Sequence, residues 1–159
     1  IIYEGNPITV QNDNIIISDK NNISLLNVNG NKIWDLNIKS NLSPVISGNT
    51  IFVINNDNFL FLINRNNGQI KYSKSINSLI TKDFKKGLKR KIKKIDHIFL
   101  TDNKLLLISR NSYFIEMNIK NTININSIKK NPFEISSDVI FLNKEMIFIT
   151  KSNRIYKVN

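Results

Sequence analysis

Residues 44–76 decide the fold of this chain, and they read PVISGNTIFVINNDNFLFLINRNNGQIKYSKSI. Four short runs rich in Ile, Val and Phe are separated by three turn dipeptides, Gly48-Asn49, Asp57-Asn58 and Asn67-Gly68. Gly, Asn and Asp suit tight hairpins because they adopt left-handed backbone angles at low cost. The block therefore predicts one small sheet of four antiparallel strands.

The same block recurs along the chain with a period of about 37 residues. Upstream, residues 7–10 match 44–47, residues 15–17 match 51–53, and Asn29-Gly30 matches Asn67-Gly68. Trp34 of the first copy then stands in the aromatic place that Tyr72 occupies in the second. Downstream copies are weaker, and we expect four units over residues 6–39, 40–77, 78–130 and 131–159.

The last two copies differ from the first two. The third has strands predicted over 98–100, 105–109, 113–118 and 122–128, after a basic insertion over residues 81–95. The fourth starts at residues 132–135, continues through 139–142, 146–150 and 154–158, and stops after its third strand. It ends without the final strand of the block, which in many propeller rings is supplied by the first strand of the whole protein.

A repeating four-stranded sheet predicts an all-β fold built from β-propeller blades. Each sheet has two faces to cover, and stacking successive sheets around an axis covers both. A β-sandwich is the competing all-β fold, but sandwich strands have no reason to recur in blocks of four. The chain starts at Ile1 with no Met. We therefore expect the four blades to be part of a seven- or eight-bladed ring, with an N-terminal portion missing and Asn159 near the C-terminus.

Composition narrows the functional classes. The formal net charge is +11 with a pI near 9.9, which fits nucleic acid, an anionic membrane surface, an acidic protein, or simply a Lys-rich codon bias. The chain has no Cys, so disulfides, thiol nucleophiles and thiolate metal sites are excluded. The apolar runs are too short to cross a bilayer, and no signal peptide is visible.

The basic insertion is the most distinctive departure from the repeat. Phe84, Leu88, Ile92 and Ile95 are spaced by four, four and three residues, which predicts one apolar side of a helix, although Gly87 weakens that helix. One interpretation is an inter-blade insertion whose Lys residues are merely solvated; the other is a binding site for an acidic protein or for anionic lipid headgroups. Nucleic acid is disfavoured because aromatic residues do not interleave with the cations. The candidate contact residues are Lys85, Lys86, Lys89, Arg90, Lys91, Lys93 and Lys94.

No catalytic, metal or cofactor site is predicted. His97 is the only His, and without a nucleophile elbow beside it we interpret it as a strand-edge residue. The oxygen-rich cluster at residues 55–58 is explained by hairpin chemistry. Trp34 is interpreted as a packing residue between blades.

The second copy resembles the PQQ-type propeller repeat. Matching residues are Ser43-Pro44-Val45, Gly48-Asn49, residues 51–54, Asp57-Asn58, Asn67-Gly68 and residues 70–72, and the Gly30 to Trp34 segment ends the first copy in the same way. In such repeats the Trp fills the gap between neighbouring blades. The chain departs from the pattern at Asn58, where Gly is usual, and at Tyr72, which replaces Trp.

Among these propellers, the chain is similar to the C-terminal half of the BamB type of outer-membrane lipoprotein, most strongly over residues 29–76. That resemblance implies a periplasmic, non-enzymatic scaffold associated with the outer membrane, whose protein partner is the barrel-assembly machinery. Two alternatives share the repeat: a fragment of a PQQ-dependent dehydrogenase and a lumenal sensor domain. The dehydrogenases typically carry a vicinal Cys pair, which this chain does not have.

Overall fold

The computed structural model describes residues 8–11, 13–19, 21–81, 84, 87–101, 104–120, 122–142 and 145–158. Over these residues the chain forms fifteen β-strands and two helices of four residues each. It divides into two compact units, residues 1–81 and residues 82–159, each of which holds two sheets. Neither described helix is long and apolar enough to cross a membrane.

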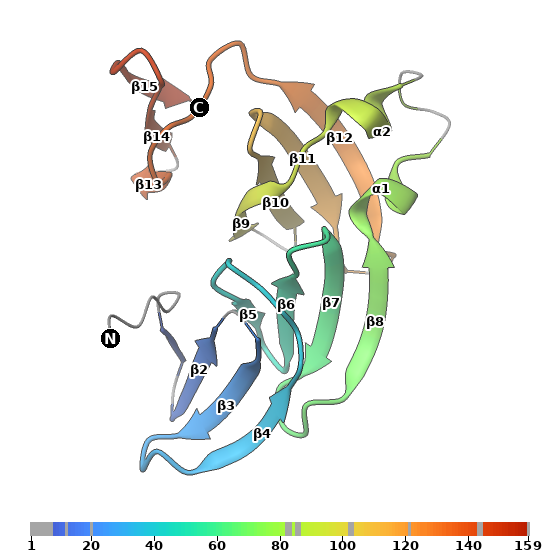
Figure 1. Cartoon of the computed structure of the whole chain (residues 1–159), viewed down its shortest axis with the longest axis vertical. Coiled ribbons are helices and arrows are strands. Elements are labelled where there is room, and N and C mark those ends of the chain that lie inside the picture. The colour runs from blue at the N-terminus through green and yellow to red at the C-terminus, as the bar shows by residue number, and fades with distance from the viewer. Residues whose placement is uncertain are drawn as a thin grey trace. The chain divides into compact units, whose positions relative to one another are not determined.

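The first unit contains two four-stranded antiparallel sheets (Figure 1). The strands of the first sheet are β1 (Thr9–Gln11), β2 (Asn14–Ser18), β3 (Ile23–Asn27) and β4 (Lys32–Leu36). Those of the second sheet are β5 (Val45–Ser47), β6 (Thr50–Ile54), β7 (Phe59–Asn64) and β8 (Ile70–Ser75). The helix α1 (Ile76–Leu79) follows β8 directly and buries Ile76 and Leu79.

The second unit contains one four-stranded and one three-stranded antiparallel sheet. After α2 (Leu88–Lys91), the first sheet is formed by β9 (Ile95–Thr101), β10 (Lys104–Ser109), β11 (Tyr113–Asn118) and β12 (Asn124–Lys130). The last sheet is formed by β13 (Ile140–Leu142), β14 (Glu145–Ile149) and β15 (Ile155–Val158). In all four sheets the described strands pair in sequence order, which is the up-and-down order of propeller blades.

The backbone angles confirm the prediction that Gly and Asn occupy hairpin positions that need a positive φ. Gly48 and Gly68 adopt positive φ, and so does Asn58 (φ 59°), which stands where the repeat usually has Gly. Ser112 (φ 59°) and Asn153 (φ 57°) are the equivalent residues of the two later sheets.

Each four-stranded sheet also has a β-bulge between its third and fourth strands. The pairing shifts register next to Leu25–Trp34, Leu62–Tyr72 and Glu116–Ser127. In the first two sheets the residue beside the bulge is aromatic, Trp34 in one and Tyr72 in the other. The sequence match between these two aromatic residues thus corresponds to the same position in both sheets.

In the first unit, the core lies between the two sheets. Ile16, Ile23 and Leu25 of the first sheet form one buried cluster with Ile51, Val53 and Ile63 of the second. Trp34 packs against this cluster, and its Nε1–H donates to the Arg65 carbonyl at 2.7 Å. The predicted role of Trp34 in packing between blades is therefore confirmed.

In the second unit, Ile108 of the four-stranded sheet packs with Met146 and Phe148 of the last sheet. Phe99 and Phe141 meet edge to face across the same boundary, with ring centroids 4.9 Å apart. The opposite face of the last sheet is apolar and open, with Ile140, Leu142, Ile149 and Ile155 between 41% and 75% exposed.

Two expected elements differ from the structure. Among the described residues of the predicted helical stripe over 81–95, only α2 is helical, because Gly87 (φ 85°) precedes it in a left-handed conformation and Ile92 (ψ 116°) is already extended toward β9. Phe84 and Ile95 are therefore outside the helix. Residues 132–135 form no strand beyond the single bridge Ile135–Thr150. Pro132 has no N–H, and the Ile135 N–H is bonded to Ser112 Oγ at 3.0 Å, so this segment is occupied by contacts to the preceding hairpin.

Candidate binding surface

The segment that leads into each of three sheets is fixed to that sheet by one equivalent backbone hydrogen bond. In each case an N–H of the hairpin between the second and third strands donates to a carbonyl of the segment. The donors and acceptors are Asn56 to Lys39 at 2.8 Å, Arg110 to Lys94 at 2.7 Å, and Lys151 to Glu134 at 2.9 Å. Lys39, Lys94 and Glu134 are therefore structurally equivalent positions.

This equivalence identifies the basic segment as an insertion in an otherwise short connector. Lys39 lies three residues after β4 ends at Leu36, and Glu134 lies four residues after β12 ends at Lys130. Lys94 lies nineteen residues after β8 ends at Ser75. The added residues include α1 and α2, and they rejoin the repeat at the same place as the short connectors do.

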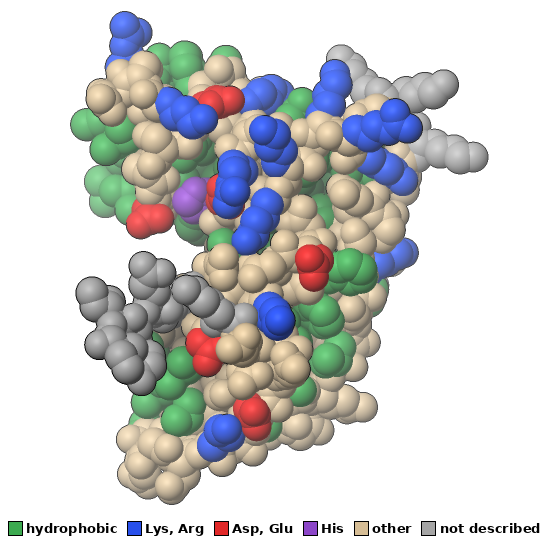
Figure 2. Space-filling view, viewed as in Figure 1, with side chains coloured by type: hydrophobic (Ala, Val, Ile, Leu, Met, Phe, Trp, Pro, Cys, Tyr) green, Lys and Arg blue, Asp and Glu red, His purple; other side chains and the backbone are tan. Residues whose placement is uncertain are grey.

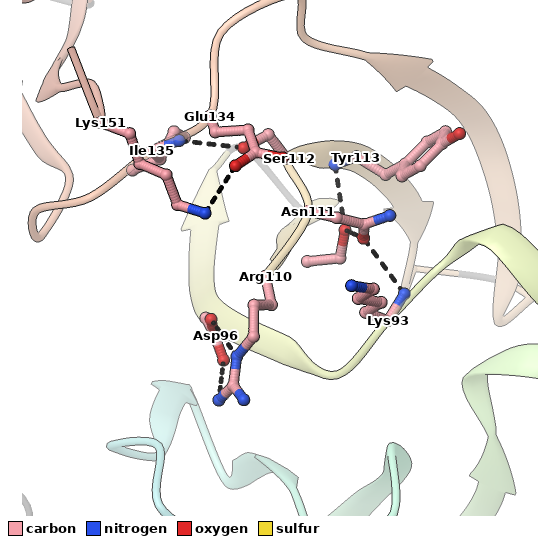
Figure 3. Close-up of polar contacts among 10 residues, drawn as sticks. Lys93, Asp96, Arg110, Asn111, Ser112, Tyr113, Glu134, Ile135 and Lys151 are labelled. Atoms are coloured by element: carbon pink, nitrogen blue, oxygen red, sulfur yellow. Dashed lines mark hydrogen bonds and ion pairs between the residues drawn. The ribbon is translucent and has the colours of Figure 1, made fainter.

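Asn111, at the tip of the β10–β11 hairpin, holds the end of the insertion (Figure 3). Its Oδ1 accepts from the Lys93 N–H at 3.1 Å, and its Nδ2 donates to the Lys91 carbonyl at 2.6 Å. Ser109 Oγ donates to the same Oδ1 at 2.9 Å and accepts from the Tyr113 N–H at 3.0 Å. One side chain thus fixes the backbone on both sides of Ile92, and this is the geometry of an anchored segment.

Burial separates the apolar residues of the insertion from its cations. Ile92 is 6% exposed and Ile95 is 1% exposed, so both side chains are part of the buried core. Lys89, Arg90 and Lys91 are exposed and make no ion pair with any described residue. Lys93 is also exposed, whereas Lys94 is half-buried. Lys85 and Lys86, the other two predicted contact residues, lie outside the described residues.

Lys130, at the end of β12, is a cation of this surface that the sequence did not point to. Its Nζ donates to the Asn111 carbonyl at 2.5 Å and lies 5.4 Å from the centroid of the Tyr113 ring. Asn111 therefore contacts both the insertion and the end of β12, although these two segments are almost forty residues apart in the sequence. We call the exposed residues Lys89, Arg90, Lys91, Lys93 and Lys130 the cationic surface.

Positive charge is concentrated in the unit that carries this surface. Residues 82–159 contain 17 Lys and Arg against 7 Asp and Glu, whereas residues 1–81 contain 6 against 5. Figure 2 shows Lys and Arg side chains spread over the visible face of the second unit. A Lys bias that acts on the whole chain would give both units a similar excess of positive charge. Codon bias alone therefore does not explain this distribution.

Most acidic residues described in the second unit are already paired with other cations. Asp96 accepts from Arg110 at 3.1 and 3.2 Å, and Glu134 pairs with Lys151 at 2.6 Å (Figure 3). Glu116 and Glu145 pair likewise with Lys104 and Lys157, at 2.8 and 2.5 Å. The hydrogen bond from Lys151 lowers the pKa of Glu134, and the positive charges of Lys130 and Lys93 lower it further. Among the acids that the structure describes in this unit, all but Asp138 therefore have an ion pair with a cation outside the cationic surface.

The remaining candidates have structural explanations. His97 lies in β9, the edge strand of its sheet, and burial lowers its pKa despite the nearby Asp96 and Asp138. Asn55 Oδ1 accepts from the N–H groups of Asp57 and Phe59 at 3.0 and 2.8 Å, as expected for hairpin chemistry. Among the described residues, no three His, Asp or Glu side chains gather as metal ligands would.

Comparison with solved structures identifies the fold. BamB from Moraxella catarrhalis superimposes with a TM-score of 0.72 over 96% of this chain, at 8% identity. BBS1N, crystallised in complex with ARL6DN, gives 0.67 over 95% at 13% identity, and the computationally designed Ika8 protein gives 0.64 over 97% at 9% identity. The chain has a β-propeller fold.

The chain spans 42% of that BamB chain, 46% of the BBS1N chain and 45% of the Ika8 chain. At identities of 8–13%, the structural similarity establishes the fold but not the function. No protein-family model and no curated protein sequence matches the chain.

Proposed function

We propose that this chain is part of a non-enzymatic propeller scaffold of the BamB type, which works in the periplasm by holding a protein partner in outer-membrane β-barrel assembly. The observation that carries the proposal is the inter-blade insertion, which is fixed to the β10–β11 hairpin while it presents exposed cations. Propellers commonly place their binding residues on connections held by a rigid ring of sheets, and an anchored basic connector suits that use.

Two further observations support the BamB type. The repeat marks resemble those of the PQQ-type repeat: Trp34 packs between two sheets, Gly68 lies in the last hairpin, and Asn58 has the positive φ of the Gly that it replaces. The BamB chain also superimposes on nearly all of this chain. Neither observation depends on the charge of the insertion, so the scaffold role and the identity of its contact surface are tested separately.

The scaffold role is tested in cells that produce the protein with an affinity tag. We expect the protein in the periplasmic or outer-membrane fraction, and we expect it to co-purify with the barrel-assembly protein after reversible crosslinking. Depletion of the protein should lower the amount of folded outer-membrane barrel proteins. A cytoplasmic location, or unchanged barrel proteins after depletion, would overturn the proposal.

The dehydrogenase alternative has its own test. The purified protein is mixed with PQQ and Ca²⁺, separated from free quinone, and examined for a quinone absorption spectrum. We expect no retained quinone. A stoichiometric bound spectrum would replace the scaffold proposal with an enzymatic one.

A further inference from the structure

We infer that the cationic surface binds an acidic polypeptide segment, in preference to a membrane surface. The inference rests on the proposed function, because it names the chemistry of the partner that the scaffold would hold. It extends the sequence prediction, which placed the contact within residues 85–94 and left both kinds of partner open.

The first step is that the surface is preorganised. The backbone on both sides of Ile92 is bonded to Asn111, whose own carbonyl accepts from Lys130. Cations held by a fixed backbone lose less conformational entropy on binding than cations of a free loop, so more of their attraction appears as affinity.

The second step concerns the directions in which the three cationic side chains of α2 extend. Lys89, Arg90 and Lys91 are consecutive residues of α2. Successive residues of an α-helix are rotated by about 100° around its axis, so these three side chains fan out over roughly 200°. A flat bilayer can meet only one side of such a turn. A polypeptide segment can bend around it and bring a carboxylate to each cation.

The third step concerns the available chemistry. Arg90 offers a planar guanidinium that pairs with a carboxylate through two parallel hydrogen bonds, while the Lys residues act as point charges. The described acids of the second unit are largely paired elsewhere, so an incoming carboxylate meets little competition. Bases of a nucleic acid would need exposed aromatic platforms beside the cations, but α2 carries none, and Tyr113, beside Lys130, is half-buried.

The test uses the purified protein and three fluorescent probes, of which the two peptides have the same length. The first is a peptide of alternating Glu and Ser, the second has Gln in place of Glu, and the third is a set of lipid vesicles with or without phosphatidylglycerol. We expect the acidic peptide to bind in low salt and to weaken as salt rises above about 0.1 M, because exposed charges are screened. The Gln peptide should not bind.

The decisive variant is Lys89→Glu with Arg90→Glu and Lys91→Glu. We expect it to weaken the acidic peptide by roughly tenfold or more, since three attractive contacts become repulsive. The matched control is Lys39→Glu with Lys71→Glu and Lys74→Glu, which makes the same change in net charge at exposed positions of the first unit. The control should weaken binding by no more than about twofold. Circular dichroism verifies that both variants keep their strand content.

Each other outcome overturns the inference. If the first variant no longer binds anionic vesicles but still binds the acidic peptide, the surface is a membrane site. If both variants weaken the peptide equally, the attraction belongs to net charge alone. If neither changes binding, the cations are merely solvated. In all three cases co-purification with the barrel-assembly protein would remain a separate result, so failure here does not count against the scaffold role.

Discussion

The indole of Trp34 lies so close to Gly68 that a Cβ atom built on the glycine would be 2.9 Å from indole Cγ and Cδ2. Trp34 belongs to the first sheet, and Gly68 lies in the β7–β8 hairpin of the second. The pair therefore locks two neighbouring blades together, with the Nε1–H bond to the Arg65 carbonyl fixing the orientation of the ring.

We predict that Gly68→Ala destabilises the protein more than Gly30→Ala. Both glycines have positive φ, 72° and 79°, so each substitution costs about 1 kcal/mol from backbone strain. Only the new methyl at position 68 meets the indole, while nothing lies within 4 Å at position 30, which adds about 1–3 kcal/mol of overpacking. Urea unfolding followed by the fluorescence of the single Trp measures the difference. Equal losses in the two variants would show that the contact carries no strain.

A second prediction concerns the anchor of the insertion. Asn111→Ala removes the bonds to the Lys93 N–H, the Lys91 carbonyl and Ser109 Oγ, and we expect a loss of roughly 1–2 kcal/mol in the free energy of unfolding. The amide of Lys93 should also exchange with solvent faster. The control is Asn49→Ala, which removes one exposed bond to Asn64 and should cost less. Unchanged exchange at Lys93 would mean that the segment is held without Asn111.

The single histidine gives a pH prediction. Burial lowers the folded-state pKa of His97 below its ordinary value of 6.5. A group with a lowered folded pKa contributes stability above its unfolded pKa, and that contribution is lost as pH falls through the folded value. We therefore expect stability to fall as pH drops below about 6.5, and His97→Gln to remove this part of the slope.

The effect of Asp138 on the pKa of His97 tests the cause that we assign to this pKa shift. The negative charge of Asp138 raises the pKa of His97, so Asp138→Asn should lower the pKa further in an NMR titration. Asp57 is not among the charges that shift this pKa, so Asp57→Asn should leave it unchanged. A pKa that rises in Asp138→Asn would contradict the assignment of charges around His97.

The strands and hairpins could be predicted because local chemistry decides them. Asn58 and Gly68 stand where the backbone needs positive φ, and the alternation of apolar runs with such residues is readable without any structure. The packing role of Trp34 could be predicted for the same reason, since one aromatic residue recurs at the bulge of each of the first two sheets.

The candidate binding surface could be predicted only in part, because its geometry depends on contacts between distant segments. The apolar spacing around Leu88 favoured a longer helix, but Gly87 and the start of β9 at Ile95 shorten it. Lys130 joins the surface through the Asn111 carbonyl, a bond that any residue at position 111 could accept. The equivalent connector bonds are likewise backbone to backbone and leave no mark on the sequence.

The most direct test of the central claim is site-specific photo-crosslinking in living cells, with a photoreactive amino acid at position 90 or at position 71. Both positions are exposed, but only the first belongs to the cationic surface. We predict an adduct with a subunit of the outer-membrane assembly machinery from position 90 and none from position 71, and we expect Lys89→Glu with Lys91→Glu to abolish it. No adduct at position 90, or equal adducts from both positions, would contradict the claim that this anchored insertion is the contact surface of a propeller scaffold.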